Sequence, residues 1–330
     1  MAVYTTIDDP EAYFQVQLYA GNGSANNAIT LGGDTDMQPD FVWIKNRDAT
    51  DSHCLFDAVR SATRLISSDS TVADSADADT LDSFASDGFQ VDADVKVNTN
   101  AENYVSFCWK ESATSGFDIV SFTGNSTART ISHSLSAVPH AILMKNISNG
   151  SAQWVVYHAG TGNTQALYLN TTAAPTDVVG FFNDTDPTSS VFTVGTDTAV
   201  NGNTNTQINY AFAPVQGFSK FGTYKGNGNA DGAFIFCGFR PAFVMEKRFN
   251  TTGEWGMFDN KRDVDNVATR QLKANATEVE EANGAIDFCA NGFKLRETSV
   301  FMNGDDDSYV FMAWAEAPLV NSEGVPGNAR

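Results

Sequence analysis

The sequence predicts an all-β protein made of three tandem antiparallel β-sandwich modules of the jelly-roll or lectin-like kind. Its apolar runs are short and rich in Val, Ile, Phe, Tyr and Trp. Clusters of Gly, Asn, Asp, Ser and Thr interrupt these runs at roughly ten-residue intervals, as turns do. The same succession of runs and turns occurs three times. Several strands within about 100 residues, joined by short turns, are typical of a sandwich.

The repeat is clearest in a six-residue motif. YAGNGS at 19–24 returns as FTGNST at 122–127 and as YKGNGN at 224–229. The matching glycines, Gly21, Gly124 and Gly226, are 103 and 102 residues apart. Solenoid and propeller repeats reach only about 50 residues, whereas about 100 residues is the size of a small domain. The spacing therefore predicts a triplicated module.

Further landmarks recur in the same order, at spacings of 99 to 106 residues. They are a proline before an apolar run (Pro39, Pro139 and Pro241), an aromatic residue in the following run (Phe56, Tyr157 and Phe258), a later phenylalanine (Phe89, Phe192 and Phe293) and a tyrosine near the module end (Tyr104, Tyr210 and Tyr309). This alignment sets Val215 against Trp109 and Trp314. The middle module is therefore expected to lack the final tryptophan.

Each module is expected to open with two short strands joined at the six-residue motif described above, which is called the GN motif below. Gly and Asn accept positive φ at low cost, so we interpret the motif as a hairpin turn. A phosphate-binding loop is excluded because no helical pattern and no GK[ST] follows.

The next runs, FVWIK at 41–45 and AILMK at 141–145, are nearly continuous, as in central strands covered on both faces. The prolines just before them fall where a missing N–H costs little. YVSFCW at 104–109 alternates like a half-buried strand, and only residues 264–282 tolerate a helix.

The expected boundaries follow from the repeat. They are an N-terminal arm at 1–15, module 1 at 16–113, module 2 at 114–215, module 3 at 216–319 and a C-terminal tail at 320–330. Hydrophobic residues make up 42% of the chain, including 24 phenylalanines, which is enough to give each module a core.

Charge and cysteine usage limit the possible environments. The net charge of −20 has the wrong sign for neutralising phosphates, so nucleic acid and anionic membrane surfaces are disfavoured as partners. Neither a membrane-spanning run nor a secretory signal is expected. The four cysteines, Cys54, Cys108, Cys237 and Cys289, do not occupy equivalent positions. We expect free buried thiols in a chain made in the cytoplasm.

No residue constellation predicts catalysis or a cofactor. A repeated D-x-x-R pattern, Asp57 with Arg60 and Asp259 with Arg262, is interpreted as a pair of structural ion pairs, and His158 stands in the corresponding place of module 2. Acidic clusters around Asp184 and Asp305 and at 74–79 could offer oxygen ligands to calcium, but none has EF-hand spacing. They are interpreted as solvated loops, and the question of a metal stays open.

The segments that carry a family resemblance are TIDDPEAYFQVQLYAGNGS, MQPDFVWIKNR, LFDAVR, SFASDGFQV and NYVSFCWK. Through them the sequence resembles a repeated module of virion structural proteins in marine tailed bacteriophages that infect cyanobacteria, Pelagibacter and relatives. The resemblance covers almost the whole chain and is strongest in module 1. It implies a non-enzymatic virion protein, tail-fibre-like, with no family catalytic residues to carry over.

A tail fibre or spike component for host attachment is the first functional hypothesis. Its partners would be other virion proteins and further copies of itself, with the arm residues Tyr4, Tyr13 and Phe14 as the virion anchor. A capsid decoration protein is one alternative. Another is a lectin-like module that binds host glycans through Trp154 and Trp255, although core packing also explains these tryptophans. Three modules in one chain could also mimic a trimer, unless they are strung out without a common axis.

Overall fold

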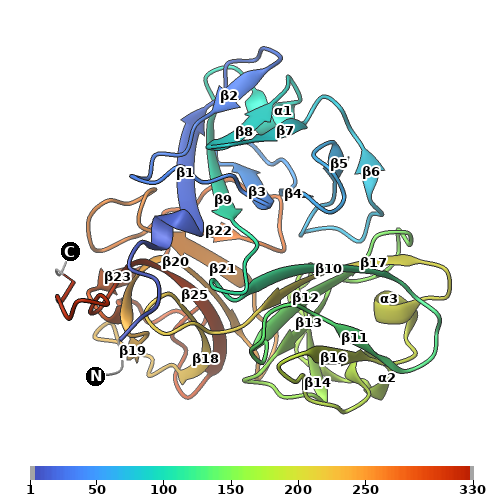
Figure 1. Cartoon of the computed structure of the whole chain (residues 1–330). Helices are drawn as coiled ribbons and strands as arrows, with labels where there is room; N and C mark the ends of the chain where they lie inside the picture. The colour runs from blue at the N-terminus through green and yellow to red at the C-terminus, as the bar shows by residue number, and fades with distance from the viewer. Residues whose placement is uncertain (1–3, 328–330) are drawn as a thin grey trace.

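The computed structural model describes residues 4–327, and their regular secondary structure is nearly all antiparallel β-sheet, as the sequence predicts (Figure 1). The ranges expected for modules 1, 2 and 3 form three lobes, drawn in blue to teal, green to yellow and orange to red. The names module 1, 2 and 3 denote these ranges below.

Module 1 and the arm contain η1 (Pro10–Ala12), β1 (Phe14–Ala20), β2 (Asn27–Ile29), β3 (Phe41–Asn46), β4 (Cys54–Asp57), β5 (Arg64–Leu65), β6 (Ser75–Ala76), β7 (Leu81–Ala85), β8 (Gly88–Val91), α1 (Val95–Asn98) and β9 (Asn103–Trp109). Module 2 contains β10 (Phe117–Thr123), β11 (Arg129–Ser132), β12 (Ala141–Asn146), β13 (Val155–His158), β14 (Gln165–Tyr168), β15 (Thr176–Asp177), α2 (Val179–Phe182), β16 (Val191–Val194), α3 (Thr198–Asn201) and β17 (Thr206–Phe212). Module 3 contains β18 (Ser219–Lys225), β19 (Phe234–Phe236), β20 (Phe239–Arg248), β21 (Trp255–Asp259), β22 (Leu272–Lys273), β23 (Ile286–Cys289), β24 (Gly292–Leu295) and β25 (Ser308–Pro318).

Every module contributes one larger and one smaller sheet. The larger sheets have the orders β1-β9-β3-β4, β10-β17-β12-β13-β14-β15 and β18-β25-β20-β21-β22. The smaller ones are β2-β8-β7, β11-β16 and β19-β24-β23, and β5 pairs with β6. The first strand of each module therefore lies beside the last. The last strand also pairs with a central strand (β3, β12 or β20), which in turn pairs with the strand that follows it (β4, β13 or β21).

The strand registers correct one part of the sequence alignment. Trp109 lies opposite Phe41, and Trp314 lies opposite Phe243. In module 2 the residue at this register position is Phe212, opposite Ala141. Phe212, and not Val215, is thus the counterpart of the two tryptophans, and Tyr210 is not the counterpart of Tyr104 and Tyr309. An aromatic residue is kept here, so only its type differs.

The hairpin interpretation of the GN motif is wrong. β1 and β2 belong to different sheets, as do β10 and β11, and β18 and β19. The motif therefore carries the chain from the larger to the smaller sheet. A Cβ on Gly21 would lie 2.1 Å from the carbonyl oxygen of Thr99, and on Gly124 and Gly226 it would lie 2.2 Å from Gly202 O and Gly304 O. Only glycine allows this close approach of two backbones.

Two smaller expectations also differ from the structure. Pro39 and Pro139 precede their strands, but Pro241 lies within β20, next to a register shift. A bulge tolerates the missing N–H, because the ladder is interrupted there. Residues 264–282 contain no helix, only the two-residue strand β22.

The larger sheets of the three modules share one apolar core. The equivalent residues Trp109, Phe212 and Trp314 contact one another, with ring centroids 5.3 to 6.3 Å apart. The void among these rings and their neighbours measures about 10 Å³, at or below the space that one water molecule needs. The modules are therefore gathered around a common, sealed axis and are not strung out. Within the described residues, no helix is long and apolar enough to cross a membrane.

Candidate functional site

The first D-x-x-R pair lies at the contact between modules 1 and 2. Arg60 donates from its backbone N to Asp57 Oδ1 at 2.8 Å and from Nε to Asp57 Oδ2 at 2.5 Å. The Tyr210 hydroxyl of β17 donates to the same Asp57 Oδ2 at 2.6 Å. Both charged side chains are at most 3% exposed. The expected ion pair forms, and it serves to join two modules.

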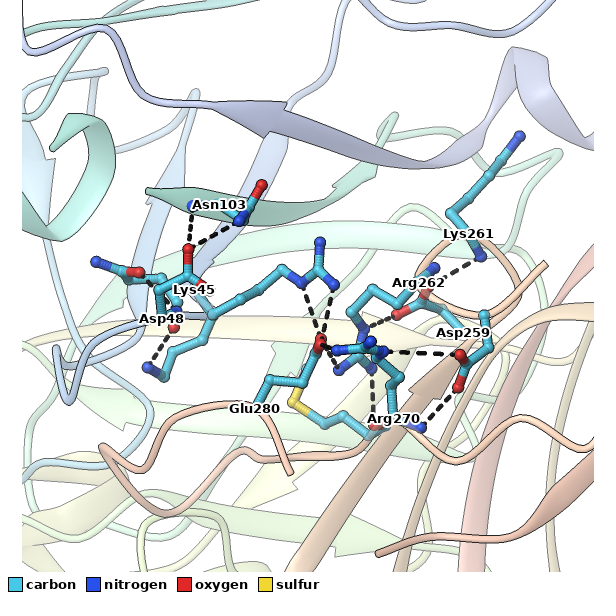
Figure 2. A network of polar contacts seen from close by, with 12 residues as sticks. Lys45, Asp48, Asn103, Asp259, Lys261, Arg262, Arg270 and Glu280 are labelled. Atoms are coloured by element: carbon cyan, nitrogen blue, oxygen red, sulfur yellow. Dashed lines mark hydrogen bonds and ion pairs between the residues drawn. The ribbon is translucent and has the colours of Figure 1, made fainter. Parts of the chain in front are cut away.

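The second pair belongs to a larger charged network between modules 3 and 1 (Figure 2). Arg262 Nε donates to Asp259 Oδ2, and its Nη1 lies 3.2 Å from Glu280 Oε2. Arg47 of module 1 forms a two-bond fork with Glu280, at 2.8 and 2.9 Å. Arg270 adds a contact of 2.7 Å to the same carboxylate.

Glu280 is thus the anion shared by three guanidinium groups, and its side chain is only 5% exposed. Burial by itself would raise the pKa of Glu280, but the bonds from Arg47 and Arg270 and the charge of Arg262 outweigh it and lower that pKa. The carboxylate is therefore held ionised, with its charge fully compensated. Such a group is an anchor between modules and has no capacity left to act as a base.

His158 occupies the corresponding position of module 2 and contacts module 3. Its Nδ1 accepts a hydrogen bond from Gly160 N at 3.0 Å, so Nε2 carries the proton and donates to Phe311 O at 3.2 Å. Burial lowers the pKa of His158 to about 4, which keeps the ring neutral at physiological pH. Asp57 and His158 thus contact the next module directly, whereas Asp259 is linked to module 1 through Arg262 and Glu280, which binds Arg47.

Trp154 and Trp255 do not form a glycan-binding surface, because both side chains are 0% exposed. Each indole N–H donates to a backbone carbonyl of the preceding module: Trp154 to Ser67 O and Trp255 to Tyr168 O, both at 2.9 Å. In module 1 the equivalent residue is His53. Its Nδ1 accepts from Trp43 Nε1, so its protonated Nε2 donates to Lys273 O of module 3, at 3.0 Å.

These three bonds run in one rotational sense around the axis: module 2 to 1, module 3 to 2, and module 1 to 3. Buried lysines add two more contacts in the same sense. Lys145 Nζ donates to Thr71 O at 2.7 Å, and Lys247 Nζ donates to Thr171 O at 3.2 Å. Burial lowers the pKa of Lys145 and Lys247 to about 8. The chain is therefore closed into a ring by equivalent contacts.

The arm is packed on its own chain and is not a free anchor. Phe14 begins β1, is 1% exposed and stacks on Trp314 at 5.9 Å. Tyr13 packs edge-on against Phe218 at 6.1 Å, and the Tyr4 hydroxyl donates to Gly238 O at 2.8 Å. A core residue such as Phe14 cannot reach another protein, so an anchor role for this residue is wrong. Tyr4 and Tyr13, which are only partly buried, tie the arm to module 3.

The remaining candidate groups are the thiols and the possible metal ligands. The four cysteines are free thiols, as expected, and burial raises the pKa of Cys108 and Cys237 to about 12. Between residues 4 and 327, no group of three or more His, Cys, Asp or Glu side chains could hold a metal ion. A surface pocket of about 190 Å³ lies at the junction of modules 1 and 3, with Gln15, Gln17 and Asn260 among its walls.

The sequence of this ring matches one family model along residues 9–318, described as a domain of unknown function, DUF7483. The chain belongs to the DUF7483 family. No curated protein and no solved structure matches it. The DUF7483 match extends across all three modules of this chain.

Sequence reasoning missed one recurrent residue of this DUF7483 chain. Asn98, Asn201 and Asn303 are fully buried, and each side-chain oxygen accepts from the backbone N of the asparagine in the GN motif, at 2.8 to 3.0 Å. Each side-chain nitrogen also donates to a loop carbonyl two residues further along, at 2.8 Å. All three asparagines lie 77 residues after the motif's first glycine, so a constant spacing was the available signal.

Proposed function

We propose that this chain is a non-enzymatic structural protein of a bacteriophage particle, exposed on its surface as a tail fibre or spike component that takes part in host attachment. We further propose that each module is a β-sandwich and that the ring of three imitates a trimer within one chain. The resemblance of the sequence to virion modules supports the proposal that the chain is part of a bacteriophage particle. The ring supports the structural role.

One observation carries the proposal: the closed cycle of contacts between modules. His53, Trp154 and Trp255 each link one module to its neighbour around a dry aromatic axis. A block of this kind resists distortion, because moving one module breaks contacts at two junctions. It also presents three similar outer surfaces about one axis, which suits attachment at a three-fold position of a particle.

The charged clusters are consistent with this role. Asp57, Asp259 and Glu280 are paired with arginines at module junctions and are at most 5% exposed, so they stabilise the ring. Host attachment would need contacts on the outer surface, at residues other than the two buried tryptophans. A surface glycan of the host remains the proposed class of receptor.

The test is the copy number of this chain in purified particles, measured by quantitative mass spectrometry against the major capsid protein. A few to a few tens of copies would support a position on the tail. Absence of the chain from the particle would overturn the proposal.

A capsid decoration protein is the second candidate, favoured by the same pseudo-three-fold ring. A single chain could occupy a three-fold capsid position that otherwise requires three subunits. The same measurement separates the two candidates, because a decoration protein would be present in hundreds of copies.

A further inference from the structure

The smaller sheet of module 3 ends in an edge strand with an exposed aromatic face. Among the strands of residues 4–327, β19 pairs only with β24, and its two phenylalanines, Phe234 and Phe236, are 45% and 51% exposed. Ile235 between them points inward and is 6% exposed. Large apolar side chains that stand together on a free sheet edge are typical of an interaction surface.

The repeat provides an internal control for this surface. Ile29, Ile131 and Ile235 each pair with the equivalent phenylalanine of the neighbouring strand, so they fix the register. The residues that flank them are Ala28 and Thr30 in module 1, Thr130 and Ser132 in module 2, and Phe234 and Phe236 in module 3. The same backbone position carries small or polar residues twice and aromatic residues once. The fold itself therefore does not require the aromatic residues.

The backbone of β19 leaves one side free to accept another strand. Ala233 O accepts from Leu295 N, and Cys237 N donates to Asn291 O, so these residues face β24. Because hydrogen-bonding direction alternates along a strand, the N–H and C=O groups of Phe234 and Phe236 point to the opposite, outer side. One of these outer groups already has a partner within the chain: Lys220 Nζ donates to the Phe236 carbonyl at 2.6 Å, and its ammonium lies 5.2 Å from the Phe236 ring centroid. A second strand that pairs at Phe236 must share or replace this bond.

Charged side chains lie at both ends of this strand. Lys220 lies at the Phe236 end. Asp231, with a side chain 80% exposed, lies before the Phe234 end, where it contacts Lys294 at 2.8 Å and Arg296 at 3.5 Å. Lys220 has Gln15 and Asp118 as its counterparts in the other modules, so its positive charge is also particular to module 3. On a chain of net charge −20, such a mixed patch is where two copies can approach with the least repulsion.

We propose that β19 is a dimerisation edge, which pairs antiparallel with β19 of a second copy across a two-fold axis at Ile235. The two smaller sheets then become one continuous sheet. Phe234 of one copy lies opposite Phe236 of the other, and Lys220 of one copy lies near Asp231 of the other. A two-fold contact needs a self-complementary surface, and the opposite charges of Lys220 and Asp231 at the two strand ends provide it. A free backbone edge favours a polypeptide partner over a glycan.

The first experiment measures the mass of the purified full chain by sedimentation velocity between about 1 and 100 μM, the range of a modest interface. We expect a monomer–dimer equilibrium in this range. The double variant Phe234→Ala with Phe236→Thr, which copies the module 1 residues, should shift it to monomer. Val300→Ala, which removes a comparably exposed apolar side chain elsewhere in module 3, should leave it unchanged.

A charge exchange tests the pairing itself. Lys220→Asp and Asp231→Lys should each weaken dimerisation at least about tenfold, because two attractive contacts become repulsive in the homodimer. A mixture of the two variants should dimerise again, and so should the double variant, because opposite charges then face each other once more. Circular dichroism confirms that each variant is folded. A monomer at all concentrations, or a dimer that none of these substitutions changes, would overturn the proposal.

Discussion

Equivalent positions in the three modules hold chemically different residues that perform the same contact. An imidazole at His53 and indoles at Trp154 and Trp255 each donate a ring N–H to a carbonyl of the preceding module. The smaller ring at His53 is accompanied by a larger neighbour, Trp43, whose counterpart in module 2 is Leu143. A small ring beside a large one in module 1 thus replaces a large ring beside a smaller side chain in module 2. The hydrogen bond to the preceding module is kept in both, since a buried donor without an acceptor is costly.

A buried acid distinguishes module 3 at the residue scale. Glu246 replaces Ile44 and Met144, lies opposite Gly256 and is 1% exposed. Burial, followed by the nearby charge of Glu297, raises the pKa of Glu246. Burial also raises the pKa of Glu297 to about 7. Neither Glu246 Oε1 nor Glu297 Oε1 has a hydrogen-bond partner, so both groups are more stable protonated.

This pair predicts a loss of stability toward alkaline pH. Since the folded state raises the pKa of Glu297 from its ordinary 4.5 to about 7, its contribution is complete below pH 4.5 and is lost as pH rises through 7. At about 1.4 kcal/mol per pKa unit the full shift would amount to roughly 3 kcal/mol, and because Glu297 is only partly buried, solvent screening makes the actual loss smaller than this. Glu297→Gln should remove the part of the decline that Glu297 causes, while the part caused by the buried Glu246 remains. Urea unfolding of both proteins from pH 5 to pH 8 measures the difference.

Glu278→Gln, at a side chain 54% exposed, is the control and should retain the slope of the natural chain. His53 and His158 act in the opposite sense, because burial lowers their pKa values to about 3 and about 4. Their contribution is lost as pH falls below about 6.5, so it cancels when variant and natural chain are compared. Parallel pH profiles for Glu297→Gln and the natural chain would contradict the assignment.

At the scale of elements, the GN motif is the corner at which each module changes sheets. The first glycine passes against a backbone carbonyl, and a buried asparagine 77 residues later ties the loop to the end of the module. Two distant segments are thereby fixed to each other in every module. This contact explains why the motif is retained in all three copies while the neighbouring residues differ.

Gly124→Ala should therefore destabilise the protein strongly. The new Cβ would lie 2.2 Å from Gly202 O, and neither backbone can move without disturbing the corner. We expect a loss of at least about 2 kcal/mol in the free energy of unfolding, as for an overpacked core. Gly150→Ala, where the nearest atom lies at 3.5 Å, is the matched control and should stay within about 0.5 kcal/mol. Equal effects of the two substitutions would show that the close approach is unimportant.

The sequence predicts much at this scale, but only where the information is local. Periodicity and turn residues identify β3, β12 and β9 and the all-β class. The hairpin interpretation of the GN motif fails because glycine and asparagine signal a turn without revealing which strands pair. The alignment of Tyr210 with Tyr104 and Tyr309 is wrong by three residues, because a matching residue type does not guarantee the same strand register. The burial of Trp154 and Trp255 depends on contacts between modules, which no local pattern reports.

At the scale of the whole molecule, the repeat does not imply independent domains. The larger sheets of all three modules line one core, and its central aromatic residues come from different modules. Modules 1 and 2 each keep a smaller core between their own two sheets. The C-terminal segment is joined to the arm, where Ser322 N donates to Asp8 Oδ1 at 2.6 Å. The arm and the C-terminal tail are therefore linked to each other beside module 3.

This arrangement predicts that the chain unfolds as one cooperative unit. Separating any module would expose the aromatic axis and break the buried contacts at two junctions, so a partly unfolded ring should be scarcely populated. Unfolding enthalpy is about 0.7 kcal/mol per residue, which gives roughly 230 kcal/mol for the whole chain and roughly 80 kcal/mol for a single module. Differential scanning calorimetry compares the total enthalpy with the van't Hoff enthalpy obtained from the width of the transition. A ratio near one is expected if the ring is the cooperative unit, whereas a van't Hoff value about three times smaller would mean that the modules unfold separately and that the shared axis contributes little. Phe212→Ala, a substitution in the aromatic axis, makes the test more specific. It should lower the melting temperature of the entire transition if the ring unfolds as one unit, whereas only module 2 would lose stability if the modules were independent.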